Sequence, residues 1–166
     1  MPNLAQSTGY AILALGFIAS AAGKPLLTRT IAEKCGLPAP FLSKIINRLA
    51  RGHLVNTQRG VNGGVMLSRP ANQITLYEVC SALDDPILVK RCMLGIAECS
   101  DARACPAHEF NIEQRNQILD FINSTTIADI ASFEMMRRWD STSPASSDPV
   151  GKNPPPPPPP AEQGEP

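Results

Sequence analysis

A periodic apolar stripe inside a strongly basic stretch constrains the fold of this chain more than any other feature. Four apolar residues between positions 40 and 51 recur at the i, i+3, i+4, i+7 spacing of one helix face: Leu42, Ile45, Ile46 and Leu49. The opposite face carries only polar and basic side chains: Ser43, Lys44, Asn47, Arg48 and Arg51. The spacing therefore predicts an amphipathic helix with one buried side and one basic, exposed side.

A shorter helix is predicted just before it. Thr28 or Thr30 is expected to cap this helix, and Thr30 with Glu33 fits a capping box, which satisfies N–H groups at a helix start. Gly36 suits the left-handed conformation that ends a helix, and Pro40 suits the first turn of the next one. Two helices joined by such a turn are typical of a helix-turn-helix. A plain helical hairpin with a solvated basic face is the alternative.

A β-hairpin is predicted after the amphipathic helix, which Gly52 and His53 end. Residues 54–58 and 65–67 are the predicted strands, and Asn62 with the two glycines after it supplies a turn that needs positive φ. A hairpin at this place is the wing of a winged helix. This predicted wing favours a DNA-binding domain over the alternative of a plain helical hairpin.

The distribution of charge supports the same interpretation. The 166 residues have zero net charge, yet residues 24–69 hold eight Lys and Arg against one acid, Glu33. Such asymmetry is expected of a nucleic-acid-binding surface. We therefore predict that this segment contacts double-stranded DNA.

Each predicted contact follows from side-chain chemistry. Side chains at the centre of the basic helix face reach base edges, and the arginines near its end hold phosphates. Arg59, at the base of the wing, suits a narrow A·T-rich minor groove, although a solvent-exposed turn arginine is an equal alternative. The predicted DNA-contacting residues are Thr28, Ser43, Lys44, Asn47, Arg48, Arg51, Arg59 and Asn62.

The two ends of the chain differ in composition. The apolar run from Tyr10 to Ala22 is too short to span a bilayer and has no basic residue before it, so a buried first helix is predicted rather than a signal peptide. From Ser141 onward the chain holds 10 of its 17 prolines and few apolar residues. This composition predicts a disordered tail.

Four metal-ligand residue types are concentrated in one short stretch, Cys92, Cys99, Cys105 and His108. Thiolates and imidazole suit both zinc and Fe–S clusters. The spacing alone leaves zinc, a cluster and reactive thiols equally open. The odd count of five cysteines argues against a disulfide framework and favours a reducing cytoplasm, with Cys35 and Cys80 as small buried side chains. No nucleophile–base pair is evident, so neither enzymatic activity nor a small-molecule substrate is expected.

At this point the chain resembles the Rrf2 family of bacterial winged-helix regulators over about residues 1–140. The resemblance is carried by Ser7-Thr8-Gly9-Tyr10-Ala11, by Arg59-Gly60-Val61-Asn62-Gly63-Gly64 with Leu67 and Arg69-Pro70, by Ile74-Thr75-Leu76-Tyr77-Glu78-Val79, and by the cysteine loop. It implies a homodimer joined by long C-terminal helices. Helical spacing after the loop predicts one helix over about 108–123 and another from near Thr126. Their apolar residues are Phe110, Ile118, Leu119, Ile122, Ile127, Ile130, Phe133, Met136 and Trp139.

The resemblance also implies an Fe–S cluster, with [2Fe–2S] favoured over [4Fe–4S] and zinc less favoured. In some members an acid of the partner's first helix is the fourth ligand, but residues 1–23 hold no Asp, Glu, His or Cys. Other members use a Cys-x-x-His sequence, which Cys105 and His108 match. The six residues between Cys92 and Cys99 depart from the five found in those members, which puts the loop geometry in question.

The predicted fold is mainly α, with a winged helix-turn-helix domain over residues 1–84 and a ligand loop over 85–108. Dimerisation helices follow over 109–140, and a disordered proline-rich tail covers 141–166. The predicted function is a dimeric, cytoplasmic transcription regulator, with a repressor favoured, whose cluster senses redox state, nitric oxide or iron and cluster status. The alternatives are a cluster-free thiol-sensing regulator and a zinc or Fe–S redox protein that does not regulate transcription. No membrane association is expected.

Overall fold

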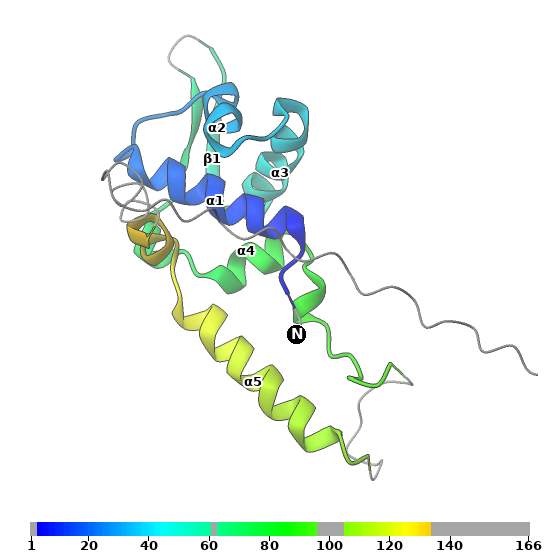
Figure 1. The fold of residues 1–166 in the computed structure, drawn as a ribbon. Helices are drawn as coiled ribbons and strands as arrows, with labels where there is room; N and C mark the ends of the chain where they lie inside the picture. Colours follow the sequence, from blue (N-terminus) through cyan, green and yellow to red (C-terminus); the bar gives the residue numbers. More distant parts are fainter. Residues whose placement is uncertain (1–2, 61–62, 96–104, 134–166) are drawn as a thin grey trace, which may run out of the picture.

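A computed structural model describes residues 3–60, 63–95 and 105–133, and these residues form a mainly helical fold (Figure 1). The elements in chain order are α1 (Gln6–Ser20), α2 (Thr28–Cys35), α3 (Ala39–Arg51), β1 (Val55–Gln58), β2 (Gly64–Leu67), the 3₁₀ helix η1 (Ala71–Gln73), α4 (Leu76–Ala82), the 3₁₀ helix η2 (Pro86–Leu88) and α5 (His108–Ser124). Residues 127–133 are also helical. Within the described ranges, no helix has the length and apolar character needed to cross a membrane. Several predictions fall outside those ranges: the turn residue Asn62, the ligand Cys99, the apolar residues Met136 and Trp139, and the tail.

Helix α1 occupies the centre of the winged-helix part. It contacts α2, α3, α4 and β2, and Figure 1 shows it between the α2–α3 pair and α4. Ala11, Ala14 and Leu15 are fully buried within it. The apolar run predicted to be a buried first helix is therefore confirmed as one.

The amphipathic helix is present as predicted. Its four stripe residues are all at most 3% exposed, whereas Lys44, Asn47 and Arg51 on the opposite side are exposed. Gly36 adopts φ +66 and ends α2. Burial of the stripe against α1 and α4 fixes which side of α3 faces outward.

The predicted cap of α2 is wrong. The helix begins at Thr28 after Leu27, and no side chain caps it; Glu33 pairs instead with Arg29 at 2.9 Å. The preceding residue, Leu26, exchanges backbone hydrogen bonds with Val65 of the wing at 3.0 and 2.8 Å. This bridge holds the chain extended up to Leu27, so the helix starts two residues before Thr30.

The wing is a two-stranded antiparallel sheet with Val55 opposite Leu67 and Gln58 opposite Gly64. An isolated antiparallel β-bridge between Leu26 and Val65 joins a third segment of the chain to this sheet. A Cβ atom on Gly64 would lie 2.7 Å from the carbonyl oxygen of Leu26, so only glycine permits this close approach.

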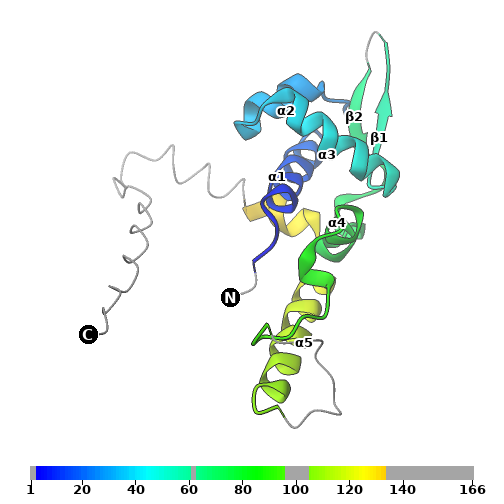
Figure 2. The same ribbon diagram turned by 90° about the vertical axis from the view of Figure 1, so that its right-hand side faces the viewer.

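Helix α5 projects away from the winged-helix part, as the two ribbon views show (Figures 1 and 2). Backbone hydrogen bonds attach its C-terminal end to the start of α4: Leu76 N–H donates to the Thr125 carbonyl, and Ile127 N–H donates to the Ile74 carbonyl. The two predicted C-terminal helices are thus confirmed as far as residue 133. Three of their aromatic side chains remain more than half exposed, which are Phe110, Phe121 and Phe133.

Candidate functional site

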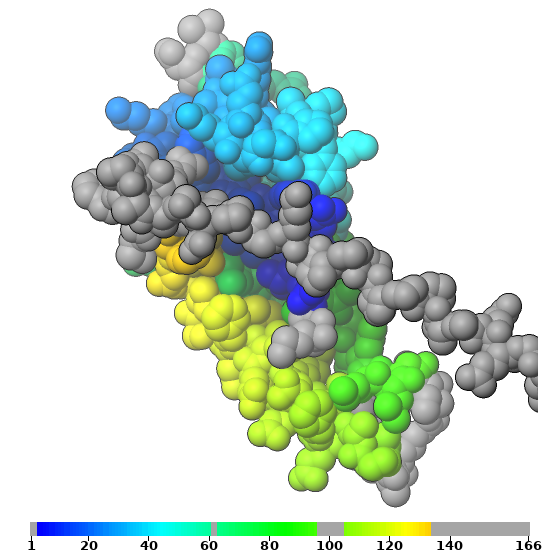
Figure 3. Space-filling model, in the orientation of Figure 1, coloured from blue at the N-terminus to red at the C-terminus, as the bar shows by residue number. Residues whose placement is uncertain are grey.

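The predicted DNA-contacting residues of α3 lie at the end of the molecule opposite α5. Figure 3 shows α2 and α3 together at that end. The side chains of Lys44, Asn47 and Arg51 are exposed there. Ser43 is half-buried, and its hydroxyl donates to the Ala39 carbonyl at 2.9 Å. Its proton is therefore used within the helix, and only its oxygen lone pairs remain to accept a hydrogen bond.

Arg48 differs from the other basic residues of α3 because it has an acidic partner. Its Nη2 lies 2.5 Å from the Oδ2 of Asp84, a residue just beyond α4. The Arg48 side chain is 34% exposed and that of Asp84 is 90% exposed. A phosphate would therefore compete with this carboxylate for Arg48. Arg51, the next arginine of α3, is exposed to solvent.

The remaining predicted contacts lie on the elements around α3. Arg59 is exposed directly after β1, where the turn of the wing begins and not at the base of the wing as predicted, and Thr28 is the first residue of α2 and half-buried. The turn that holds Asn62 is outside the described residues. Helix α3, the start of α2 and the turn side of the wing therefore carry the described part of the predicted interface.

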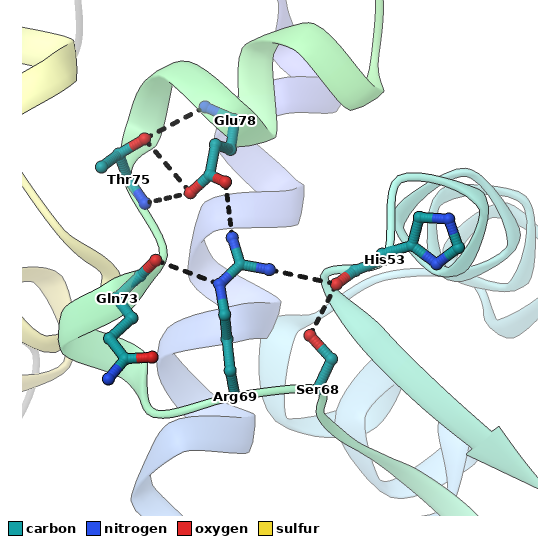
Figure 4. A network of polar contacts seen from close by, with 6 residues as sticks. All are labelled: His53, Ser68, Arg69, Gln73, Thr75 and Glu78. Atoms are coloured by element: carbon teal, nitrogen blue, oxygen red, sulfur yellow. Dashed lines mark hydrogen bonds and ion pairs between the residues drawn. The ribbon is translucent and has the colours of Figure 1, made fainter.

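A polar network fixes the wing to the rest of the fold (Figure 4). Arg69, two residues after β2, donates to the His53 and Gln73 carbonyls at 3.2 and 3.1 Å, and its Nη2 pairs with Glu78 at 2.5 Å. Glu78 also completes a capping box with Thr75, in which the Thr75 N–H donates to its carboxylate at 3.0 Å. The network thus joins the end of α3, the wing and α4.

Two tight turns frame the predicted ligand loop. Gly95 N–H donates to the Cys92 carbonyl at 3.1 Å, and Gly95 has φ +70. His108 N–H donates to the Cys105 carbonyl at 3.0 Å, so the Cys-x-x-His sequence forms one turn that leads into α5. Cys92, Cys105 and His108 are each half-buried.

The segment before the loop is fastened to the start of α5. Asn111 Nδ2 donates to the Arg91 carbonyl at 3.1 Å. One turn further along α5, the Arg115 guanidinium donates to the Leu88 carbonyl at 2.7 Å and to the Val89 carbonyl at 3.1 Å. These contacts bring the chain that leads into Cys92 alongside the helix that His108 begins.

The donor set suits a thiolate-bound metal. Two thiols and one imidazole lie at the two ends of the loop, and such ligands are preferred by zinc and by Fe–S clusters. No three His, Cys, Asp or Glu side chains gather in one place among residues 3–60, 63–95 and 105–133. The predicted ligand Cys99 lies in the gap between the last two of these ranges.

The two cysteines outside the loop occupy different surroundings. Cys80 is fully buried in α4, and burial, with a smaller contribution from the charge of Asp85, raises the pKa of its thiol to about 11. Its predicted role as a small buried side chain is confirmed. Cys35 at the end of α2 is half-buried and packs against the core, so the same prediction holds only in part for it, because the turn to α3 leaves one side of that position at the surface.

Sequence reasoning missed Asn111, Arg115 and Arg69. All three donate to backbone carbonyls of residues distant in the chain. A sequence pattern does not directly indicate which distant backbone carbonyl a side chain will bind. The spacing of His108, Asn111 and Arg115, which places them on one helix face, is the single available indication.

Comparison with known proteins points to one family. The family model Rrf2, described as an iron-dependent transcriptional regulator, matches residues 4–132. The chain is 31% identical over 133 residues to the HTH-type transcriptional regulator IscR of Sodalis glossinidius, with 80% of each chain covered. It is 30% identical over 132 residues to IscR of Escherichia coli O1:K1, covering 78% of this chain and 80% of that protein. The structure of CymR, the global cysteine regulator of B. subtilis, matches with a TM-score of 0.68 at 24% identity, over 80% of this chain and 98% of that one.

Proposed function

The chain belongs to the Rrf2 family of transcriptional regulators, and from that premise we propose that an Fe–S cluster in its ligand loop controls its affinity for DNA. The proposed ligands are Cys92, Cys99, Cys105 and His108. The relatives are regulators of transcription and not enzymes, and the proposed activity is likewise regulatory binding.

One observation carries the proposal. Asn111 and Arg115 hold residues 87–91 against α5, the helix into which the turn formed by Cys105 and His108 leads. Ligands far apart in the chain must be brought together before a metal can use them, and preformed ligand positions reduce the entropy lost on binding. These contacts supply that preorganisation for the two ends of the loop.

The chemistry of the donors favours a cluster over zinc. Three thiolates and one imidazole suit a [2Fe–2S] cluster, which we favour over [4Fe–4S]. Such a cluster exchanges electrons, whereas zinc has no redox chemistry. The relatives named IscR and the description of the family as iron-dependent support iron as the metal.

The DNA-binding half of the proposal places α3 in the major groove. Lys44, Asn47 and Ser43 contact base edges, and Arg51 contacts phosphate with Arg48, which must first exchange its Asp84 partner. Arg59 contacts the minor groove, and Thr28 and Asn62 complete the proposed interface.

We further propose that the protein acts as a cytoplasmic homodimer on double-stranded DNA, with repression favoured. The exposed aromatic side chains of α5 and of residues 127–133 support a dimer, because several apolar side chains exposed on neighbouring helices often mark a surface that a partner covers. The hydrogen bonds between residues 74–76 and 125–127 then provide a physical link from the dimer helices to α4.

Anaerobically purified protein tests the proposal through its visible absorption spectrum and its iron and sulfide content. We expect a coloured protein whose spectrum is lost in Cys92→Ala and altered in His108→Ala. Cys80→Ala is the matched control, because this thiol lies in α4 outside the loop and is fully buried, so its loss should leave the spectrum unchanged. A colourless protein without iron would overturn the cluster and leave a zinc-dependent or thiol-sensing regulator.

A further inference from the structure

We propose that Arg115 is a positioning residue that aligns Cys92 with His108 and joins the ligand loop to the winged-helix part through η2. The identity of the bound group rests on the proposed function. The alignment of Cys92 with His108 does not require a bound metal, so it can be tested in the metal-free protein.

The contacts of Arg115 resemble a helix cap made by a distant side chain. Its guanidinium donates to three consecutive carbonyls, those of Ile87 at 3.4 Å, Leu88 at 2.7 Å and Val89 at 3.1 Å. These carbonyls lie at the end of η2, where the last carbonyls of a helix lack partners within it. A planar guanidinium presents several donors in a fixed fork, whereas a lysine ammonium cannot reproduce this geometry.

A second contact fixes the direction of the strand-like segment that follows η2. Asn111 lies one turn before Arg115 on α5, and it donates to the Arg91 carbonyl. Residues 87–91 therefore run antiparallel to α5. His108 lies three residues before Asn111, a rise of about 4.5 Å in a helix, and Cys92 lies one residue after Arg91, a step of about 3.3 Å in extended chain. Cys92 consequently reaches the level of the first turn of α5, where His108 is found.

The opposite end of η2 is held by a buried carboxylate. Asp85 is only 1% exposed, and its Oδ1 accepts the Ile87 N–H while its Oδ2 accepts the Ala5 N–H, both at 2.9 Å. Ala5 directly precedes α1. The 3₁₀ helix is thus fixed to α1 at its start and to α5 at its end.

This arrangement makes η2 a short rigid connection between the ligand loop, the dimer helix and the first helix of the DNA-binding part. A displacement of Cys92 that is passed along residues 89–91 either moves η2 or breaks the Arg115 contacts. The structure thereby assigns to Arg115 two measurable effects: protection of Cys92, and transmission of the loop's state to DNA.

The test measures alkylation of Cys92 by iodoacetamide in the metal-free, reduced full-length protein, with peptide mass spectrometry to follow each cysteine. The variants are Arg115→Met, Arg115→Lys and the control Gln114→Met, which introduces the same side chain at the exposed neighbouring position. Loss of charge-assisted hydrogen bonds should raise the local opening of the segment, and hence the alkylation rate of Cys92, by about tenfold in Arg115→Met. We expect a smaller increase in Arg115→Lys, and a rate near that of the wild type in Gln114→Met.

Buried Cys80 provides the internal standard, because a general loss of folding would expose it as well. Increased Cys92 alkylation with Cys80 still protected supports a positioning role. Equal Cys92 rates in Arg115→Met and Gln114→Met would overturn it. If Arg115→Met fails to fold, Arg115→Lys decides the question by the same comparison.

Measurements of DNA affinity test whether Arg115 transmits the state of the ligand loop to the DNA-binding part. In Arg115→Met, the ratio between the affinities of the metal-bound and metal-free forms should approach one, and an unchanged ratio would overturn this half of the proposal. Absence of any metal from the wild-type protein would instead contradict the proposed function, and it would leave the alkylation result intact.

Discussion

Arg69 and Glu78 form an ion pair that joins the base of the wing to the first turn of α4 (Figure 4). The same guanidinium donates to the His53 carbonyl at the end of α3, and the same carboxylate accepts the Thr75 N–H. The two side chains are 29% and 40% exposed, so the pair is only partly screened by solvent. The orientation of the wing relative to α3 therefore depends on a contact with α4.

Replacing this arginine should destabilise the fold. Arg69→Met leaves the carbonyls of His53 and Gln73 without this donor, and we expect the free energy of unfolding to fall by about 1–2 kcal/mol. Urea denaturation measures the change. Arg29→Met is the control, because its pair with Glu33 is exposed, and it should remain within about 0.5 kcal/mol of wild type. An equal loss in both variants would show that the network contributes nothing beyond a surface pair.

The salt dependence of DNA binding should identify the phosphate contacts. Arg51→Ala removes an exposed charge of α3, and the slope of log affinity against log salt concentration should decrease in magnitude by about 0.9. Anisotropy titrations on one DNA duplex at several salt concentrations provide the slope. The control is Lys90→Ala, an exposed lysine outside the basic segment, for which no change in slope is expected. Identical slopes in wild type and Arg51→Ala would remove Arg51 from the interface.

Releasing Arg48 from its carboxylate should strengthen DNA binding. Asp84→Asn removes the charge that Arg48 contacts at 2.5 Å, and it also removes a negative charge near α3. We expect higher affinity for any duplex, with a difference that fades at high salt because the effect is electrostatic. Weaker or unchanged binding at low salt would contradict a phosphate-binding role for Arg48.

Arg59 offers a test of sequence preference. Arg59→Ala should weaken binding to sites with A·T-rich flanks more than binding to G·C-rich sites, because a narrow minor groove attracts arginine most strongly. A pair of duplexes that differ only in their flanks gives the ratio. Arg51→Ala should weaken both duplexes alike, so a uniform effect of Arg59→Ala would mean that it contacts phosphate only.

The buried thiol of Cys80 predicts a loss of stability in alkaline solution. Its pKa is raised in the folded protein from 9.0 to about 11, mainly by burial, so folding favours the protonated thiol. The resulting stabilisation is complete below pH 9 and is lost as the pH rises through about 11, and its full size is about 3 kcal/mol. Denaturation at pH 8 to 11 should therefore show a smaller decline for Cys80→Ala than for wild type. An equal decline in the stability of the two proteins would contradict the raised pKa of Cys80.

The winged helix was predictable because local patterns and tertiary packing agree there. The stripe of α3 has a helical period and is the face that becomes buried, and Gly36 adopts the left-handed conformation expected after α2. The hairpin was predictable from its glycine-containing turn between two short strands. Each of these features depends on residues close together in the chain.

Other features depend on contacts that local sequence does not specify. Thr30 and Glu33 have the residue types of a capping box, but the bridge between Leu26 and Val65 makes α2 begin earlier, and the capping box is found at Thr75 instead. The order of the ligand residues was evident from the sequence. The contacts of Asn111 and Arg115 that align the two ends of the loop were not, because backbone carbonyls of any residue type serve as their partners.

DNA affinity before and after removal of the cluster tests the central claim most directly. The measurement uses duplexes selected from a random pool by both forms of the protein, with Cys92→Ala as the permanently cluster-free control. We expect removal to change the affinity for at least one selected duplex by about tenfold or more, the usual size of coupling between two sites. The Cys92→Ala variant should match the cluster-free wild type. Equal affinities of the two forms on every duplex would contradict control of DNA binding by the ligand loop.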